Sequence, residues 1–374
     1  MRVLLVVGET ASLFTSGIVQ QVYYTRQSLK AAGVYTEVAA FAPPLDAYAG
    51  VDIHTWQIHP DSDLRGFDAL LFISTNLKPD DPLSQPFYAR LRRQGIKIAS
   101  MLCGNYFYLL QEQFVLGMHA QNNLRDTLAN PYIDEFWALE TYRNHAGFMR
   151  ALVGPRLRIL PYCWSDQIMR RYCERHDRDA QNNSGRRGGL RIVVAEPNLS
   201  LHKTATVPLL IADGIMRARG VDAPPAKVML LGGQNLRHDV LAPFLEAYRA
   251  ERVETYGRLN VFDVLAELKE KDHPVLIVSH HMDNGLNFLQ FETVTLGYPV
   301  VHNSRQLRDT GGYYQDFDIE GAVDRGLALL SESAADSAQR KRDESVILER
   351  FGVAADRVVQ GYAEALEALT GKSI

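Results

Sequence analysis

The stretch from His280 to Ser304, HHMDNGLNFLQFETVTLGYPVVHNS, begins with a polar cluster and continues as an apolar segment that carries one carboxylate, Glu292. It follows the apolar run VLIVS and ends in a second such run, YPVVHNS, and both are typical of buried strands. Between them, Asp283 or Asn284 can cap a helix through LNFLQFETVTL that stops at Gly297. This order of strand, helix and strand predicts an α/β fold built on a parallel sheet.

The same alternation extends along the whole chain. Runs typical of strands are RVLLVV, YTEVAAF, ALLFIS, KIASML, EFWAL and RLRILPY in the front half, and LRIVVAEPN, KVMLLGG, HPVLIVSHH and YPVVHNS in the back half. Segments with a helical period lie between them, for example GIVQQVYYTRQSLKAAG, YRNHAGFMRALVG, ATVPLLIADGIMRARG and RHDVLAPFLEAYRA. The alternation therefore predicts one Rossmann-like sheet in each half of the chain.

A charged, glycine-ended stretch with almost no apolar residues separates the two series. We predict a first domain at residues 1–169, a linker at 170–190, a second domain at 191–345 and a C-terminal helix at 346–374. Amphipathic helix is expected from about Ser337 to Leu369 with an interruption at Gly352, and it is expected to return to the first domain. The two domains are expected to face each other across a cleft.

Composition narrows the class of protein. With 374 residues, 46% hydrophobic and 22% charged, the chain can bury two cores. Residues 1–190 carry 20 Lys and Arg against 18 Asp and Glu, and residues 191–374 carry 20 against 26, so neither half has the basic footprint of a duplex-binding protein. Three cysteines without C-x-x-C spacing, no signal-peptide core and no membrane-spanning apolar run predict a cytoplasmic protein.

Ligands of open parallel sheets bind beyond the carboxyl ends of the strands, and the chain lacks the fingerprint G-x-G-x-x-G. After VLIVS come His280 and the amides of Gly285, Leu286 and Asn287, which are predicted to form an anion site at a helix N-terminus. Glu292 lies eight residues after Asn284, or roughly 12 Å along a helix, which matches the span from a phosphate to a ribose. Ribose hydroxyls could satisfy a carboxylate that is costly to bury alone.

Other strand ends supply further candidates for the same site. EPNLSLHK follows the first strand of the back half and offers Glu196, Asn198 and Lys203, while Gly233 follows KVMLLG. In the front half, GETASLFTSG follows the first strand, and Ser16 and Gly17 begin the next helix with free amides.

The segment NGLNFLQFETVTLGYPVV resembles the donor site of GT-B glycosyltransferases, in which a Glu, seven residues and a second Glu precede a G-x-P-V-V strand. Glu292 matches the second Glu, whereas Asn284 stands in place of the first, so the resemblance leaves the sugar and the stereochemistry open. Together with EPNLSLHKTATVPLLIADG, the segment is still more similar to the bacterial and phage proteins of the DUF2827 family.

The resemblance implies a glycosyltransferase whose back domain binds a nucleotide diphosphate sugar and whose front domain binds the acceptor. Lys203 would stabilise the leaving diphosphate, and we expect no metal ion or other cofactor. The catalytic base is expected from Glu9, Glu112 or His119. A surface or capsular glycan and a hydroxymethylated pyrimidine in phage DNA are both candidate acceptors.

Other interpretations remain. A sugar-nucleotide epimerase of the same build and a non-catalytic nucleotide-sugar binding protein are alternatives that fold resemblance cannot separate. Lys203 and Glu292 could be ordinary surface residues, and His280 and His281 more often end a strand than bind a metal. The sequence leaves the oligomeric state open.

Overall fold

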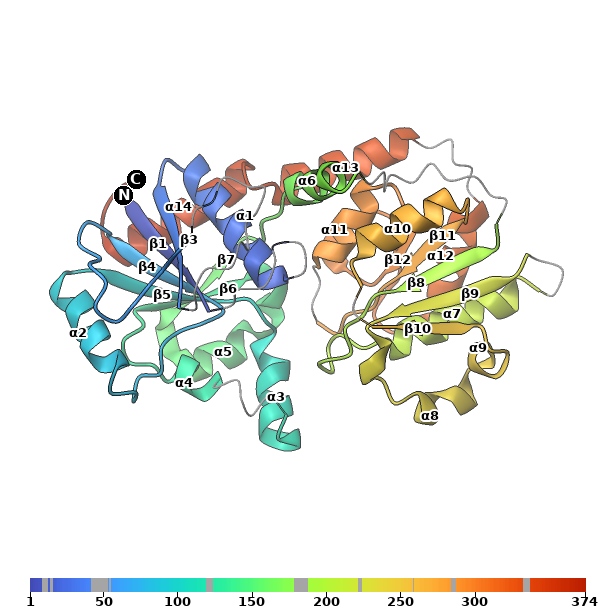
Figure 1. Cartoon of the computed structure of the whole chain (residues 1–374), viewed down its shortest axis with the longest axis horizontal. Coiled ribbons are helices and arrows are strands. Elements are labelled where there is room, and N and C mark those ends of the chain that lie inside the picture. The colour runs from blue at the N-terminus through green and yellow to red at the C-terminus, as the bar shows by residue number, and fades with distance from the viewer. Residues whose placement is uncertain are drawn as a thin grey trace. The chain divides into compact units, whose positions relative to one another are not determined.

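The computed structural model describes residues 1–8, 13, 16–41, 53, 55–118, 124–177, 188–220, 224–257, 259–283, 287–331 and 337–374. The chain divides into two compact units (Figure 1). Unit 1 contains Met1–Ile168 and Leu348–Ile374, and unit 2 contains Met169–Ile347. The C-terminal segment thus returns to the unit that contains the N-terminus, as predicted, and Lys372 forms an ion pair with Asp68.

Unit 1 is built on a seven-stranded parallel sheet in the order β3-β2-β1-β4-β5-β6-β7. Its strands are β1 (Arg2–Val7), β2 (Tyr35–Ala40), β3 (Thr55–Gln57), β4 (Ala69–Ile73), β5 (Lys97–Leu102), β6 (Glu135–Leu139) and β7 (Leu157–Leu160). Its helical segments are α1 (Gly17–Ala31), α2 (Ser84–Arg93), α3 (Tyr106–Leu116), α4 (Leu124–Leu128), η1 (Glu140–His145), α5 (Ala146–Val153), η2 (Gly154–Arg156) and α14 (Asp356–Thr370).

Unit 2 is built on a six-stranded parallel sheet in the order β10-β9-β8-β11-β12-β13. Its strands are β8 (Leu190–Val194), β9 (Ala226–Leu231), β10 (Val253–Tyr256), β11 (Val275–Val278), β12 (Val300–His302) and β13 (Gly312–Tyr313). Its helical segments are α7 (Thr206–Ala218), η3 (Gly233–Asn235), α8 (His238–Leu241), η4 (Ala242–Phe244), α9 (Glu246–Arg249), α10 (Val261–Glu270), α11 (Phe288–Thr295), η5 (Arg305–Leu307) and α12 (Ile319–Ser331). The division between the units falls within α6 (Gln167–Arg175) and α13 (Ser337–Phe351).

The central strands read as continuous apolar runs because helices cover both faces of each sheet. In unit 2, alternate residues of β8 join the side chains of α7 and α12 in one buried cluster that includes Ile192, Leu209 and Ala322. On the other face, Phe262 of α10 and Phe291 of α11 are also buried. The strand order of unit 2 reverses between β8 and β11, and such a reversal is where open α/β sheets bind ligands.

The strands expected from the sequence are present, but β3, β10 and β13 were not predicted. These three lie at or next to the sheet edges and are short and only partly buried, so their apolar pattern is weak. The helix predicted for RHDVLAPFLEAYRA was wrong as a single element: it is broken into α8, η4 and α9. Pro243 lies at the start of η4 and has no amide hydrogen to donate, so a continuous helix is not sustained there.

Part of the predicted linker is helical, because α6 continues to Arg175. Its apolar side chains Ile168, Met169 and Tyr172 are buried, which stabilises the helix despite the surrounding charges. Residues 178–187 of that linker lie outside the described residues.

The predicted interruption at Gly352 is confirmed, since it separates α13 from α14. The chain at Trp164 crosses there: its amide donates to the Phe351 carbonyl at 2.7 Å, and the Val353 amide donates to the Trp164 carbonyl at 3.0 Å. A Cβ on Gly352 would lie 2.3 Å from the Leu348 carbonyl oxygen of α13, so the backbone at the end of this helix requires glycine. Among the helices that the structure describes, none combines the length and apolar character of a membrane span.

Candidate functional site

The candidate site lies in unit 2 at the carboxyl ends of β8 and β11, the two strands at which the strand order reverses. Glu196 follows β8 by two residues, and Ser279, His280 and His281 follow β11 directly. The loop after β8 and the helix α11 after β11 therefore emerge next to each other at the carboxyl ends of the strands.

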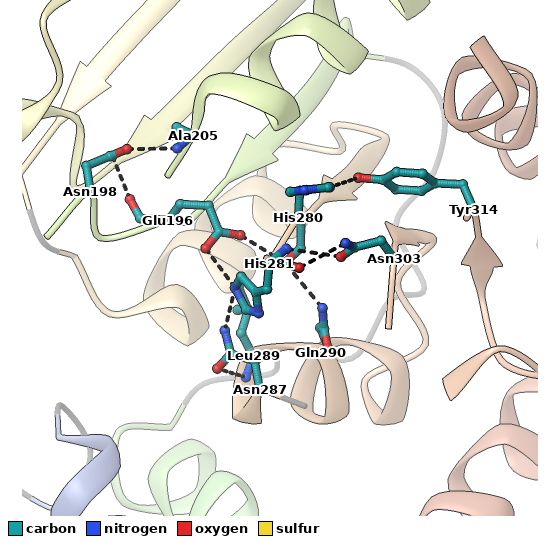
Figure 2. Close-up of polar contacts among 11 residues, drawn as sticks. Glu196, Asn198, Ala205, His280, His281, Asn287, Leu289, Gln290, Asn303 and Tyr314 are labelled. Atoms are coloured by element: carbon teal, nitrogen blue, oxygen red, sulfur yellow. Dashed lines mark hydrogen bonds and ion pairs between the residues drawn. The ribbon is translucent and has the colours of Figure 1, made fainter. Parts of the chain in front are cut away.

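A buried hydrogen-bond network centred on Glu196 joins these two elements (Figure 2). One carboxylate oxygen accepts from Ser279 Oγ at 2.9 Å, and the other lies 2.8 Å from Nε2 of His281. Burial alone would raise the pKa of Glu196, but His281, Ser279 and the charge of Lys203 outweigh it and lower that pKa below its ordinary value. Glu196 is therefore a buried carboxylate that stays ionised.

The network continues into α11 through Gln290, whose Nε2 donates to Ser279 Oγ at 3.4 Å. Asn287 Nδ2 lies 3.2 Å from His281 Nε2, but this is a packing contact, because that ring nitrogen donates to Glu196. His281 Nδ1 and Gln290 Oε1 are buried and have no hydrogen-bond partner within the described part of the chain. Buried polar atoms without partners are uncommon, so this part of the site has capacity for further hydrogen bonds.

Asn198 organises the loop that carries Lys203. It has a left-handed backbone with φ of 53°, and its Nδ2 donates to the carbonyls of Glu196 at 2.8 Å and Gly232 at 3.2 Å. Its Oδ1 accepts from the Ala205 amide at 2.8 Å, and its own amide donates to the Lys203 carbonyl at 3.2 Å. The Asn198 side chain is thus occupied in holding the loop together.

Lys203 lies in the loop after β8 and is half-buried. Burial lowers the pKa of its ammonium group, and the nearby Glu196 carboxylate opposes that change. The Lys203 ammonium group makes no hydrogen bond or ion pair with any residue that the structure describes. It is therefore a cation available to an anionic ligand.

The predicted start of α11 was wrong. The helix begins at Phe288 and its N-cap is Asn287, whose Oδ1 accepts from the Leu289 amide at 3.4 Å, rather than Asp283 or Asn284. Asparagine caps a helix well because its side-chain oxygen accepts from an unpaired amide of the first turn. Glu292 is therefore five residues from the cap, or about 7.5 Å along the axis instead of 12 Å.

Of the predicted anion site at the amides of Gly285, Leu286 and Asn287, the first two residues lie outside the described residues, as does the predicted cap Asn284. The side chain of Asn287, the remaining member of that predicted group, instead caps α11 and contacts His281.

Glu292 is the most unusual side chain of the site. It is only 6% exposed, and burial raises the pKa of its carboxyl group from 4.5 to about 8. Within the described residues, this carboxyl group makes no hydrogen bond and no ion pair. A buried carboxyl without partners is costly, so Glu292 is a candidate to accept hydrogen bonds from a ligand.

The two histidines after β11 have different surroundings. His280 Nδ1 lies 2.7 Å from the Tyr314 hydroxyl, its ring centroid lies 4.8 Å from that of Phe317, and burial together with His281 lowers its pKa to about 4. His281 faces Glu196, and its backbone exchanges hydrogen bonds with the Asn303 side chain at 3.0 and 2.9 Å. Only His280 was predicted for the site, whereas His281 is the residue that contacts Glu196, because consecutive residues leaving a strand point to opposite sides.

Several other predicted residues lie apart from this network. Gly233 is buried, and a Cβ there would lie 2.7 Å from Thr255 Cγ2, so its packing requires glycine. In unit 1, Ser16 caps α1 by accepting from the Val19 amide at 3.4 Å, and Gly17 is the first residue of that helix, as expected. Glu112 is completely buried, whereas Glu9 and His119 lie outside the described residues.

Three Asp-x-Asp triplets occur in the chain, at residues 61–63, 177–179 and 316–318. Asp63 pairs with Arg65, Asp316 pairs with Arg305, and Asp318 accepts from the Gly321 amide at 2.9 Å. The described residues contain no group of three or more His, Cys, Asp or Glu side chains that could hold a metal ion.

Two Rossmann-like units of this topology define a GT-B fold, which comparison with solved structures supports. An α-glucosyltransferase in complex with UDP and a DNA containing an HMU base matches with a TM-score of 0.61 and 10% identity over all of both chains. T4 phage BGT in complex with UDP-glucose matches with a TM-score of 0.51 and 9% identity, again over all of both chains. WaaG, a glycosyltransferase involved in lipopolysaccharide biosynthesis, matches with a TM-score of 0.51 and 12% identity over all of both chains. Identities this low show the fold alone.

The chain belongs to the DUF2827 family, described as proteins of unknown function, because the family model matches residues 3–366. No curated protein sequence matches it significantly.

Proposed function

We propose that this protein is a glycosyltransferase that moves a sugar from a nucleotide diphosphate sugar to an acceptor hydroxyl. The observation that carries the proposal is Glu292, a buried carboxyl on α11 without a partner among the described residues, at the strand-order reversal of a GT-B unit. Two ribose hydroxyls would donate to its two oxygens and so offset the cost of burying it.

Lys203 would act on the diphosphate. As the bond between the anomeric carbon and the diphosphate oxygen breaks, negative charge grows on that oxygen, and a fixed ammonium group stabilises it. The acceptor oxygen bonds to the anomeric carbon, and its proton passes to a base. This arrangement supplies the charge that a metal ion would otherwise supply, so we propose a metal-independent reaction.

The first domain is proposed to bind the acceptor and to supply the base. Glu9 and His119 remain the candidate bases, while the complete burial of Glu112 argues against it. The acceptor is proposed to be either a glycan or a hydroxymethylated pyrimidine in DNA. Two solved glycosyltransferases of the same fold support testing both, since one is involved in lipopolysaccharide biosynthesis and the other is in complex with a DNA that contains an HMU base.

The donor site can be tested without knowing the sugar or the acceptor. Calorimetry with UDP, GDP and dTDP should identify one nucleoside diphosphate that binds, and Glu292→Gln should weaken it by roughly 1.5–3 kcal/mol, about ten- to a hundredfold. Glu292→Ala should weaken it further. If UDP or GDP is the nucleotide that binds, both variants should also discriminate less between it and its 2′-deoxy analogue. Equal affinities for wild type and both variants would remove Glu292 from the site.

The reaction itself is tested by incubating donor sugars with candidate glycans and with hydroxymethylated DNA. A glycosylated acceptor supports the proposal. Accumulation of a free hexose epimer would indicate an epimerase instead, and donor that stays intact with every acceptor would indicate a binding protein.

A further inference from the structure

Glu196 cannot touch a ligand directly, because its side chain is completely buried. Its carboxylate nevertheless lies between the two elements that carry the proposed ligand-binding residues. Lys203 is seven residues further along the same loop, and Glu292 lies on α11, which Glu196 reaches through side chains at the end of β11.

Two chains of contacts run from Glu196 to α11. The first passes from Oε1 to Ser279 Oγ at 2.9 Å and on to Gln290 Nε2 at 3.4 Å. The second passes from Oε2 to His281 Nε2 at 2.8 Å, where Asn287 Nδ2 lies 3.2 Å away as a packing contact only, because a ring nitrogen that donates to Glu196 cannot also accept. Gln290 lies in the first turn of α11, so the hydrogen-bonded route holds the start of this helix against the end of β11, and the packing of Asn287 on His281 adds to it.

The same carboxylate acts on Lys203 through its charge. Because Glu196 is buried and ionised, its field at the half-buried ammonium group is less screened than that of a surface carboxylate, and it favours the charged lysine.

We propose that Glu196 is the positioning residue of the donor site, which orients α11 so that Glu292 meets the ribose. This inference rests on the proposed function for its ligand, but its effect on α11 does not require one.

Glu196→Gln tests the proposal with little change of shape. A glutamine side chain offers one accepting oxygen where the carboxylate offers two, so either Ser279 or His281 loses its acceptor, and the charge beside Lys203 disappears. Asp213→Asn is the matched control, because Asp213 is also a buried carboxylate of unit 2, and its Oδ1 accepts from the Ala247 amide of α9 at 2.7 Å. It holds a different helix.

The first measurement is hydrogen exchange of ligand-free protein, followed by mass spectrometry of the peptide that contains α11. We expect faster exchange of α11 in Glu196→Gln and unchanged exchange in Asp213→Asn. Unchanged exchange of α11 in Glu196→Gln, or equal acceleration in both variants, overturns the proposal. If Glu196→Gln does not fold, Ser279→Ala removes the Gln290 route alone and is judged by the same criterion.

The second measurement is calorimetry with UDP and 2′-deoxy-UDP. Glu196→Gln should bind UDP about tenfold more weakly or worse, and its preference for UDP over the deoxy analogue should fall towards that of Glu292→Ala. Weaker binding in Lys203→Ala and Glu292→Ala but not in Glu196→Gln overturns the positioning role and leaves the proposed function standing. If wild-type protein binds none of UDP, GDP and dTDP, the proposed function fails, and hydrogen exchange still decides whether Glu196 positions α11.

Discussion

Replacing Glu292 with glutamine should remove a pH-dependent loss of stability from the ligand-free protein. Burial raises the pKa of Glu292 from 4.5 to about 8 in the folded state. Between these values the unfolded chain has already lost the proton that the folded chain retains, so the free energy of unfolding falls as pH rises through this window. At about 1.36 kcal/mol per pKa unit, the whole shift corresponds to roughly 5 kcal/mol, of which roughly 3 kcal/mol lies between about pH 6 and pH 9.

Urea denaturation at both pH values measures this effect. Wild type should lose roughly 3 kcal/mol more than Glu292→Gln between about pH 6 and pH 9, because all other titrating groups are common to both proteins and cancel in the difference. The same pH dependence in both proteins would show that Glu292 is not buried as an unpartnered acid.

Nucleotide binding should then release the proton of Glu292. At about pH 7 a carboxyl group with a pKa of about 8 is about 0.9 protonated, and hydroxyl donors from a ribose favour its ionised form. Calorimetry in buffers of different ionisation enthalpy should therefore detect up to about 0.9 proton released by wild type for each UDP bound. Glu292→Gln should release fewer protons by the same amount, because it lacks this carboxyl group. Equal release by both proteins would refute the ribose assignment.

Two further predictions concern other parts of the chain. Lys203→Ala should lower the melting temperature only slightly, because the ammonium group makes no hydrogen bond or ion pair with the residues that the structure describes, and Glu196, which its charge helps to keep ionised, still has His281 and Ser279 as partners. It should lower sugar transfer by about a hundredfold or more. Transfer within a few-fold of wild type would contradict its role at the diphosphate. Gly352→Ala should destabilise unit 1 by about 1–3 kcal/mol, because the added Cβ would lie 2.3 Å from the backbone oxygen of Leu348. An unchanged thermal unfolding curve would show that the end of α13 adapts freely.

Much of the architecture could be predicted from the sequence, because buried parallel strands and amphipathic helices each have a characteristic local pattern of apolar residues. The apolar runs predicted ten of the strands, and the return of the C-terminal helix and its break at Gly352 were also predicted correctly. The edge strands β3, β10 and β13 were missed because short, partly exposed strands depend on a neighbour for their hydrogen bonds and carry little apolar signal.

Some features of the candidate site could likewise be predicted from the sequence, and others were decided by the tertiary structure. Sequence alone singled out Glu292 and Lys203, since an isolated carboxylate in an apolar helix and a lysine after a strand are visible as local departures from pattern. The helix start at Asn287 was decided by the fold, because Asp283, Asn284 and Asn287 can all cap a helix and tertiary contacts select one of them. The pairing of Glu196 with His281 joins residues 85 positions apart, so only the alignment of β8 beside β11 brings these two side chains together.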